Sequence, residues 1–136
     1  MRKKHFIYLI LLLFPILTVC CGEGYTSSKE AKVLLDYLKP EKLKELTENP
    51  NEQIIIIDVR PAQAYKNGHI PTAKSFPSSE ILKRLDEIPK DKFLILYCET
   101  GGRAQAVIRQ LEKKGYTLMM NWGGYKRWKW EYIKGE

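Results

Sequence analysis

Two uninterrupted apolar runs constrain the fold of this chain more than any other feature of its sequence. The first is Ile54-Ile55-Ile56-Ile57 and the second is Phe93-Leu94-Ile95-Leu96-Tyr97. Such runs, in which apolar and polar residues do not alternate, are typical of strands buried on both faces. Strands of that kind belong to parallel sheets, which need helices on both sides. The two runs therefore predict a parallel sheet inside two layers of helices.

The segments around these runs have the spacing of helices. In residues 103–114, Ala104, Val107, Ile108 and Leu111 form one apolar face. Further helices are expected over 30–38, over 41–47 with Pro40 just inside the start, over 61–66, from Ser78 and Ser79 through Leu85, and after Gly123-Gly124. Short strands are expected over 73–76 and over 117–121. This alternation predicts an α/β fold, a central parallel β-sheet flanked by helices on both faces.

The composition is that of one globular domain. The 136 residues are 44% hydrophobic and 29% charged, which excludes a disordered, collagen-like or disulfide-scaffold protein. The formal charge is +7, but three of the 23 basic residues lie in the first four positions. Without them, 20 basic residues stand against 16 acidic ones, a charge of +4. This mildly basic balance gives no reason to expect a nucleic-acid partner.

Residues 1–19 have the organisation of an export signal peptide. Residues 1–5 are basic, and residues 6–19 form an apolar run that contains Pro15 and Thr18. The run is shorter than the roughly 20 residues that span a bilayer, which favours a cleaved signal over a permanent membrane helix.

The end of this segment, Leu-Thr-Val-Cys-Cys-Gly, resembles a bacterial lipoprotein signal, in which the cysteine after the cut is acylated. The resemblance implies a cut before Cys20 or Cys21, with the lipid expected on Cys20. Residues 20–29 would then form a tether and residues 30–136 the folded domain. We expect an exported bacterial protein, periplasmic or at the cell surface and anchored to a membrane by its lipid. Simple secretion and an uncleaved anchor are the alternatives.

Cys98 is the one cysteine in the body of the chain, at the end of the second apolar run. Ligands of α/β proteins bind at the carboxyl ends of parallel strands. The residues that follow provide a glycine-containing loop, a helix N-terminus and Arg103, all of which favour an anion and the thiolate form of a cysteine. These features indicate a nucleophile for an anionic or sulfur-bearing substrate. The alternative is a buried cysteine before an ordinary helix cap.

Neither a metal nor an organic cofactor is expected. His69 is the one histidine after the signal segment, and with Cys98 it makes too few ligands for a zinc site. The sequence contains no motif typical of an organic cofactor site.

Three stretches together resemble the rhodanese family of sulfurtransferases. They are IIDVRPAQAYKNGHIPTAKSFP, LYCETGGRAQAVIRQLEKKGY and NWGGYKRW, and the resemblance extends from Leu38 to Trp130. The first is similar to the family's Asp-Val-Arg segment followed by Gly-His-Ile-Pro. The second is similar to its active-site loop and the third to its closing Gly-Gly and Trp. All three occur in the family's order with ordinary spacing.

The resemblance implies a persulfide mechanism and a rhodanese-like fold. Cys98 would take a sulfane sulfur from thiosulfate, polysulfide or a persulfide, and would pass it to a thiophilic acceptor such as cyanide or a thiol. The groups that would bind the substrate are the backbone N–H groups of Glu99, Thr100, Gly101, Gly102 and Arg103, with the Arg103 side chain on the donor. A protein could also serve as the sulfur acceptor.

The same resemblance implies structural support, and not catalysis, from Asp58, Arg60 and His69. Trp122, Trp128 and Trp130 are expected to pack in the core and at its rim. We expect a monomer.

The length of the loop distinguishes two anion chemistries. Phosphatases related to rhodanese have five residues between the cysteine and the arginine, whereas four residues separate Cys98 from Arg103 here. The loop is therefore expected to fit sulfur and not phosphate. Glu99 adds a negative charge where a dianionic donor would approach, which favours polysulfide, a persulfide or a protein donor over thiosulfate.

Two alternatives to an enzyme are a non-enzymatic sulfur carrier and a protein-interaction module. Rhodanese-like interaction modules commonly lack the loop cysteine, whereas this chain has Cys98. Turnover would distinguish an enzyme from a carrier, and persulfide formation on Cys98 would distinguish either of them from an interaction module.

Overall fold

A computed structural model of the chain describes residue 32 and residues 34–135. The expected signal peptide, lipid-bearing cysteines and tether, residues 1–29, lie outside the described residues. Within the described part of the chain, no helix is both long and apolar enough to cross a membrane.

Four parallel strands form the central sheet. They are β1 (Ile54–Asp58), β2 (Lys74–Ser75), β3 (Phe93–Cys98) and β4 (Met119–Gly124). Their order across the sheet is β2-β1-β3-β4, so the two apolar runs of the sequence become its adjacent inner strands. Residues 54–58 of β1 pair in register with residues 93–97 of β3. This position buries both runs and explains why neither alternates with polar residues.

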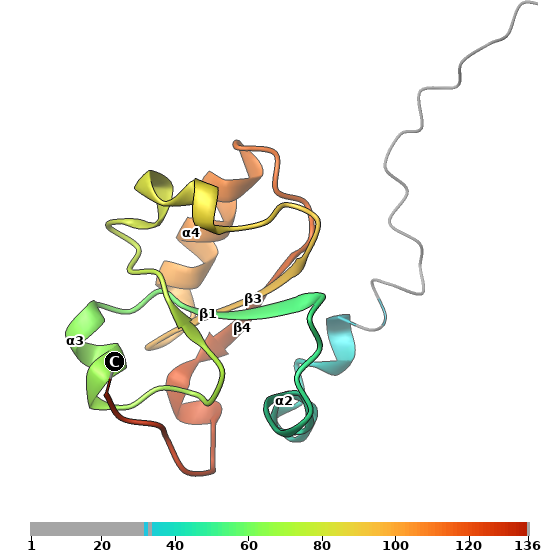
Figure 1. Ribbon diagram of the computed structural model, residues 1–136, viewed down its shortest axis with the longest axis vertical. Helices are drawn as coiled ribbons and strands as arrows, with labels where there is room; N and C mark the ends of the chain where they lie inside the picture. Colours follow the sequence, from blue (N-terminus) through green and yellow to red (C-terminus); the bar gives the residue numbers. More distant parts are fainter. Residues whose placement is uncertain (1–31, 33, 136) are drawn as a thin grey trace, which may run out of the picture.

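The helices cover both faces of the sheet, which confirms the predicted fold class. The helices α2 (Pro40–Glu48) and α3 (Ala62–Asn67) lie on one side, and α4 (Gly102–Glu112) lies on the other (Figure 1). Successive residues of β3 divide between the two resulting cores, since Leu94, Leu96 and Cys98 pack with α4 while Ile95 and Tyr97 pack with α2 and α3.

The expected apolar face of α4 is confirmed, because Ala104, Val107, Ile108 and Leu111 are all buried. α2 has Pro40 at its start as expected, and it buries Leu43 and Leu46. Of the helix expected over 30–38, residue 32 and residues 34–36 are helical, and a turn follows.

Three expected elements differ from the structure. The segment from Ser78 through Leu85 forms two 3₁₀ turns, η1 (Ile81–Lys83) and η2 (Leu85–Glu87), in place of one helix. Neither turn has a side-chain cap, and each lasts three residues, since the chain changes direction at Arg84 and again before Pro89. The strand expected over 117–121 is β4, which begins and ends later, at Met119 and Gly124.

The helix expected after Gly123-Gly124 is a third 3₁₀ turn, η3 (Tyr125–Arg127), followed by extended chain. Long-range contacts replace the helix there. Ile133 exchanges backbone hydrogen bonds with His69, and Gly135 N–H donates to the Lys66 carbonyl. The C-terminal chain is thereby held along the end of α3.

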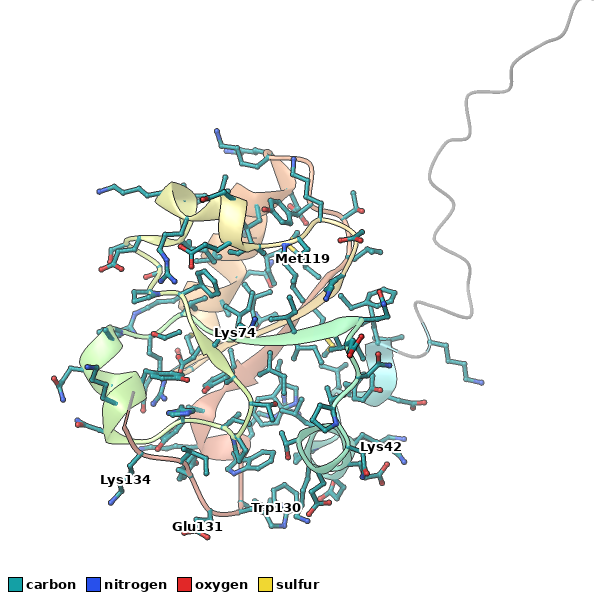
Figure 2. All side chains as sticks on the ribbon, viewed as in Figure 1. Lys42, Lys74, Met119, Trp130, Glu131 and Lys134 are labelled. Atoms are coloured by element: carbon teal, nitrogen blue, oxygen red, sulfur yellow. The ribbon has the colours of Figure 1, made fainter. Side chains whose placement is uncertain are left out.

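The three tryptophans pack as expected. Trp122 and Trp128 are buried, and Trp130 is half-buried against Trp128, with ring centroids 5.0 Å apart. Trp130 lies at the lower edge of the molecule in Figure 2, next to α2, where the Lys44 ammonium is 5.7 Å from its ring.

Candidate active site

Cys98 lies at the carboxyl end of β3, immediately before the loop that leads into α4. Its side chain packs in the core on the α4 side, and the residue is 1% exposed. The backbone N–H of Gly101 donates a hydrogen bond to Cys98 Sγ over 3.1 Å. A sulfur that accepts a backbone N–H at a helix N-terminus is well placed to carry negative charge.

The loop can adopt this shape because residue 101 is glycine. Gly101 has φ +99°, a left-handed conformation that side chains disfavour, and it immediately precedes α4. It also lies close to β4, where a Cβ on Gly101 would be 3.1 Å from Gly123 Cα. Both constraints hold the loop tightly between β3, α4 and the end of β4.

The two charged side chains expected to meet the substrate, Glu99 and Arg103, lie on either side of the loop glycines. Both residues are exposed, and Arg103 is in the first turn of α4, which starts at Gly102. Arg103 therefore adds its positive charge to the positive end of the helix dipole. Thr100 and Gly102 are also exposed, whereas Gly101 is buried.

Asp58 and Arg60 form a buried ion pair at the end of β1. Arg60 Nη2 donates to Asp58 Oδ2 over 2.6 Å, and the guanidinium Nε contacts both carboxylate oxygens at 3.0 Å. Arg60 also donates to the Gly68 carbonyl over 2.7 Å, and its guanidinium carbon lies 3.9 Å from the centre of the Tyr125 ring. Burial disfavours the charged form of Arg60, but the bonds to Asp58 outweigh it and raise the pKa of Arg60.

This ion pair reaches the nucleophile loop, residues 99–101 after the candidate nucleophile Cys98, through Glu99. Arg60 Nη1 lies 3.9 Å from Glu99 Oε2, and the Glu99 side chain is 46% exposed. Asp58, Arg60 and Glu99 thus form a line of alternating charges from the buried strand end to the rim of the site.

His69 lies in a structural setting. It is 5% exposed, its ring stacks on Tyr65 with centroids 3.7 Å apart, and Nδ1 is 3.0 Å from the Tyr65 carbonyl oxygen. Its backbone pairs with Ile133 of the C-terminal segment. These contacts of His69 join α3 to the C-terminal segment.

Two residues of β4 that the sequence analysis left out of the site contact the nucleophile loop. Asn121 Nδ2 donates to the Gly101 carbonyl over 3.0 Å. Gly124 lies so close to the loop that a Cβ there would be 2.9 Å from the Glu99 carbonyl oxygen. The adjacent Gly-Gly pair was a signal of close backbone approach, but the sequence did not reveal which segment approaches it.

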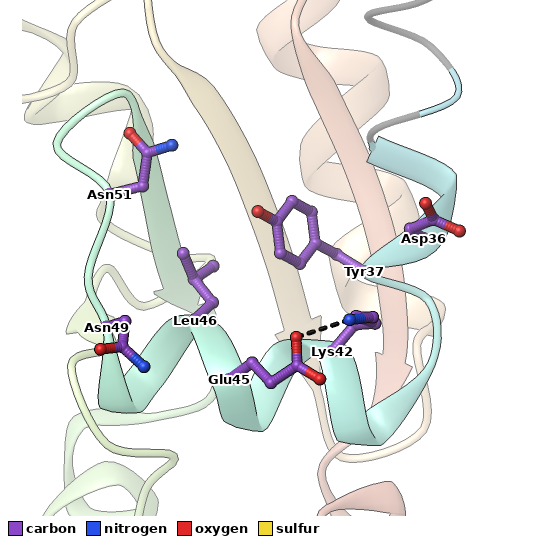
Figure 3. Close-up of a pocket in the computed structure, with 7 residues that line it drawn as sticks. All are labelled: Asp36, Tyr37, Lys42, Glu45, Leu46, Asn49 and Asn51. Atoms are coloured by element: carbon purple, nitrogen blue, oxygen red, sulfur yellow. Dashed lines mark hydrogen bonds and ion pairs between the residues drawn. The ribbon is translucent and has the colours of Figure 1, made fainter.

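Two pockets lie away from Cys98. One, of about 600 Å³, is bordered by α2 and the chain before it, with Tyr37 and Leu46 facing into it and the Lys42–Glu45 ion pair at its edge (Figure 3). The other, of about 290 Å³, lies beside the start of β1. Neither of these two pockets includes a residue of the loop. Within the described residues, no cluster of three or more His, Cys, Asp or Glu side chains could hold a metal ion.

Comparisons with known proteins identify similar sequences and a similar fold. The model of the Rhodanese-like domain family matches residues 39–131. The uncharacterized protein YqhL of Bacillus subtilis is 38% identical over 74 residues, which are 54% of this chain and 59% of that protein. A sulfurtransferase of Allochromatium vinosum is 33% identical over 78 residues, 57% of this chain and 73% of that protein. The match thus spans less than two thirds of the length of YqhL.

Among solved structures, a rhodanese-like domain protein from Staphylococcus aureus superposes with a TM-score of 0.62 at 27% identity. The match covers 71% of this chain and 95% of that one.

Proposed function

Since the chain belongs to the Rhodanese-like domain family, we propose that it is a sulfurtransferase that carries a sulfane sulfur on Cys98. The observation that carries the proposal is the hydrogen bond from Gly101 N–H to Cys98 Sγ at the carboxyl end of β3. The Gly101 N–H can stabilise Cys98 both as a thiolate and as a persulfide, because either form carries its negative charge at the N-terminal end of α4.

The proposed reaction has two displacements. The Cys98 thiolate attacks a sulfane sulfur of the donor, a Cys98–S bond forms, and the donor's S–S bond breaks. The leaving group is a thiolate from a persulfide, a shorter polysulfide from a polysulfide, and sulfite from thiosulfate. A thiophilic acceptor then attacks the outer sulfur of the persulfide, and the Cys98 thiolate leaves. Each step moves one electron pair, and the cycle consumes neither an oxidant nor a reductant.

The charges around the loop support a choice of donor. The positive end of α4 and Arg103 favour an anion, whereas the exposed Glu99 carboxylate repels one. A persulfide carries one negative charge and a polysulfide spreads its charge along a chain of sulfurs, whereas thiosulfate is a compact dianion. We therefore propose polysulfide or persulfide donors, with a thiol, cyanide or a protein thiol as acceptor.

We also propose that the protein is exported, with a lipid on Cys20, at the periplasmic or cell-surface side of a membrane. The support is the organisation of residues 1–19 and the two cysteines that follow. Radiolabelled fatty acid should enter the wild type and the Cys21→Ser variant but not Cys20→Ser. Labelling of Cys20→Ser but not of Cys21→Ser would place the lipid on Cys21, and an unlabelled wild type would contradict the lipid anchor.

Turnover tests the enzymatic proposal. The purified full-length chain is given polysulfide or thiosulfate together with cyanide, and thiocyanate is measured against time. With Cys20 and Cys21 replaced by serine, the wild-type site should produce many equivalents per protein molecule above the protein-free reaction, faster with polysulfide, whereas Cys98→Ser should not exceed the protein-free reaction. A single equivalent would indicate a sulfur carrier in place of an enzyme. No loading from either donor would leave a protein-interaction module as the better account.

A further inference from the structure

The Asn121 side chain connects β4 to the nucleophile loop by three hydrogen bonds. Its Nδ2 donates to the Gly101 carbonyl over 3.0 Å and to Gln105 Oε1 over 3.2 Å. Its Oδ1 accepts the backbone N–H of Gly123 over 2.9 Å. One amide thereby contacts the loop, the first turns of α4 and the end of its own strand.

An amide is the side chain that these three partners require. Asn has two N–H donors and a carbonyl acceptor, and each has a partner here. A carboxylate of the same shape would have no donor for the Gly101 carbonyl, and an aliphatic side chain would have neither donor nor acceptor. The three contacts therefore use both N–H donors and the carbonyl acceptor of Asn121, a combination that Asp and Leu lack.

The end of β4 is shaped so that Asn121 reaches the loop. Leu96 pairs with Asn121 but Tyr97 pairs with Gly123, so the register shifts by one residue and leaves Trp122 unpaired in the ladder. Beyond this bulge the backbone of Gly123 and Gly124 lies directly against the loop, at the distances given above. The loop thus rests on β4, and Asn121 is the polar side chain at the contact.

Gly101 is the residue through which this contact reaches the sulfur. Its carbonyl accepts from Asn121 Nδ2 and from the Gln105 backbone N–H, while its own N–H donates to Cys98 Sγ. Because Gly101 is in a left-handed conformation with no Cβ, its own torsions are weakly restrained. A second donor on the carbonyl restrains those torsions, and with them the direction of the N–H.

We propose that Asn121 is a positioning residue for Cys98. By holding the Gly101 carbonyl, it keeps the Gly101 N–H aimed at the sulfur and thereby stabilises the negative charge of the thiolate, and of the persulfide that the proposed function requires. Asn121 itself touches neither the sulfur nor, in this account, the substrate.

The test compares full-length Asn121→Leu and Asn121→Ser with the wild type. Leucine removes both the donors and the acceptor without adding charge. Serine keeps an oxygen for the Gly123 N–H but is too short to reach the Gly101 carbonyl. Gln105→Ala is the matched control, because it removes the other partner of Asn121 Nδ2 and leaves the Gly101 contact in place. Cys20 and Cys21 are replaced by serine in every protein, so that Cys98 is the one thiol.

Two readouts are measured on each protein. The first is the rate of alkylation by iodoacetamide against pH, and the second is the single-turnover rate of sulfur loading from polysulfide. We expect both Asn121 variants to need a higher pH for half-maximal alkylation and to load sulfur about tenfold more slowly, because loss of the Asn121 contact weakens the hydrogen bond from Gly101 N–H to Cys98 Sγ. Gln105→Ala should match the wild type in both.

A purely structural role for Asn121 would lower the thermal midpoint and leave the pH dependence of alkylation in the folded fraction unchanged, and that result would overturn the inference. The readouts also separate this inference from the proposed function. If the wild type takes up no sulfur but the alkylation profile still shifts, sulfur transfer is wrong and the positioning role stands. If the wild type loads sulfur but the alkylation profile of the Asn121 variants does not shift, sulfur transfer stands and the positioning role is wrong.

Discussion

At the residue scale, charge decides what the candidate site can accept. Glu99 Oε2 lies 3.9 Å from Nη1 of the buried Arg60, and the Glu99 side chain is 46% exposed. Arg60 and solvent each screen part of the Glu99 charge, and the remainder acts on an incoming donor. The sequence predicted the negative charge of Glu99 next to Cys98. It did not predict the contact of Glu99 with Arg60, because residues 60 and 99 meet only through the pairing of β1 with β3.

Glu99→Gln should improve thiosulfate as a donor more than it improves polysulfide. Two unit charges about 6 Å apart at an effective dielectric near 20 repel by about 3 kcal/mol before salt screening, so the thiosulfate kcat/KM should rise about tenfold relative to polysulfide. The ratio is measured with cyanide as acceptor at low and high salt. An unchanged ratio at low salt would show that Glu99 does not select the donor.

Asp58→Asn should destabilise the protein by about 3–5 kcal/mol, because it leaves the charge of Arg60 buried and uncompensated. Urea unfolding followed by fluorescence measures the free energy of unfolding. The matched control is Glu45→Gln, which breaks the exposed Lys42–Glu45 pair and should leave the free energy of unfolding almost unchanged. Equal effects of the two substitutions would contradict a structural role for the buried pair.

At the scale of elements, the spacing of apolar residues predicted the helices and strands that depend on local sequence alone. The inner strands and the buried face of α4 follow from apolar runs and spacing, and the structure confirms them. The 3₁₀ turns between β2 and β3, and the extended chain after η3, depend on partners distant in sequence, as when Ile133 pairs with His69. The helical spacing of aromatic residues after Gly124 could not reveal that these distant contacts would replace a helix.

Gly124→Ala tests whether the nucleophile loop rests on β4. Gly124 has φ −92°, which alanine adopts without strain, so the added Cβ acts mainly through its contact with the Glu99 carbonyl, 2.9 Å away in the present geometry. We expect sulfur loading to fall about tenfold or more while the protein remains folded, since small displacements of catalytic groups are costly. Gly135→Ala, whose Cβ would meet no atom within 4 Å but whose φ of +94° strains alanine, is the control for destabilisation without contact with the loop. Wild-type loading by Gly124→Ala would mean that the loop tolerates displacement.

At the scale of the whole molecule, Tyr97 links the sheet to the segment after α3. Its hydroxyl accepts the Ile70 backbone N–H over 3.2 Å, and the residue is fully buried between the sheet and the α2–α3 layer. The sequence predicted a buried strand here but not that its tyrosine would hold residue 70, because that contact depends on how the layers pack.

Burial, with a further contribution from Asp58, raises the pKa of Tyr97 above its ordinary value of 10.0. The unfolded chain therefore ionises this phenol at a lower pH than the folded protein does. The corresponding stability is fully present below pH 10.0 and is lost as the pH rises above it. Urea unfolding at pH 8 and at pH 11 should show a smaller loss for Tyr97→Phe than for the wild type. Equal losses would contradict this assignment.

The mass of the Cys98 peptide from the full-length chain after exposure to polysulfide tests the central claim most directly. The protein is first reduced, then desalted, treated and digested, so that the modified peptide is identified. The account predicts one added sulfur on the peptide that contains Cys98, none on that peptide in Cys98→Ser, and removal of the sulfur by cyanide. An unmodified Cys98 peptide in the reduced wild type would contradict the sulfurtransferase account.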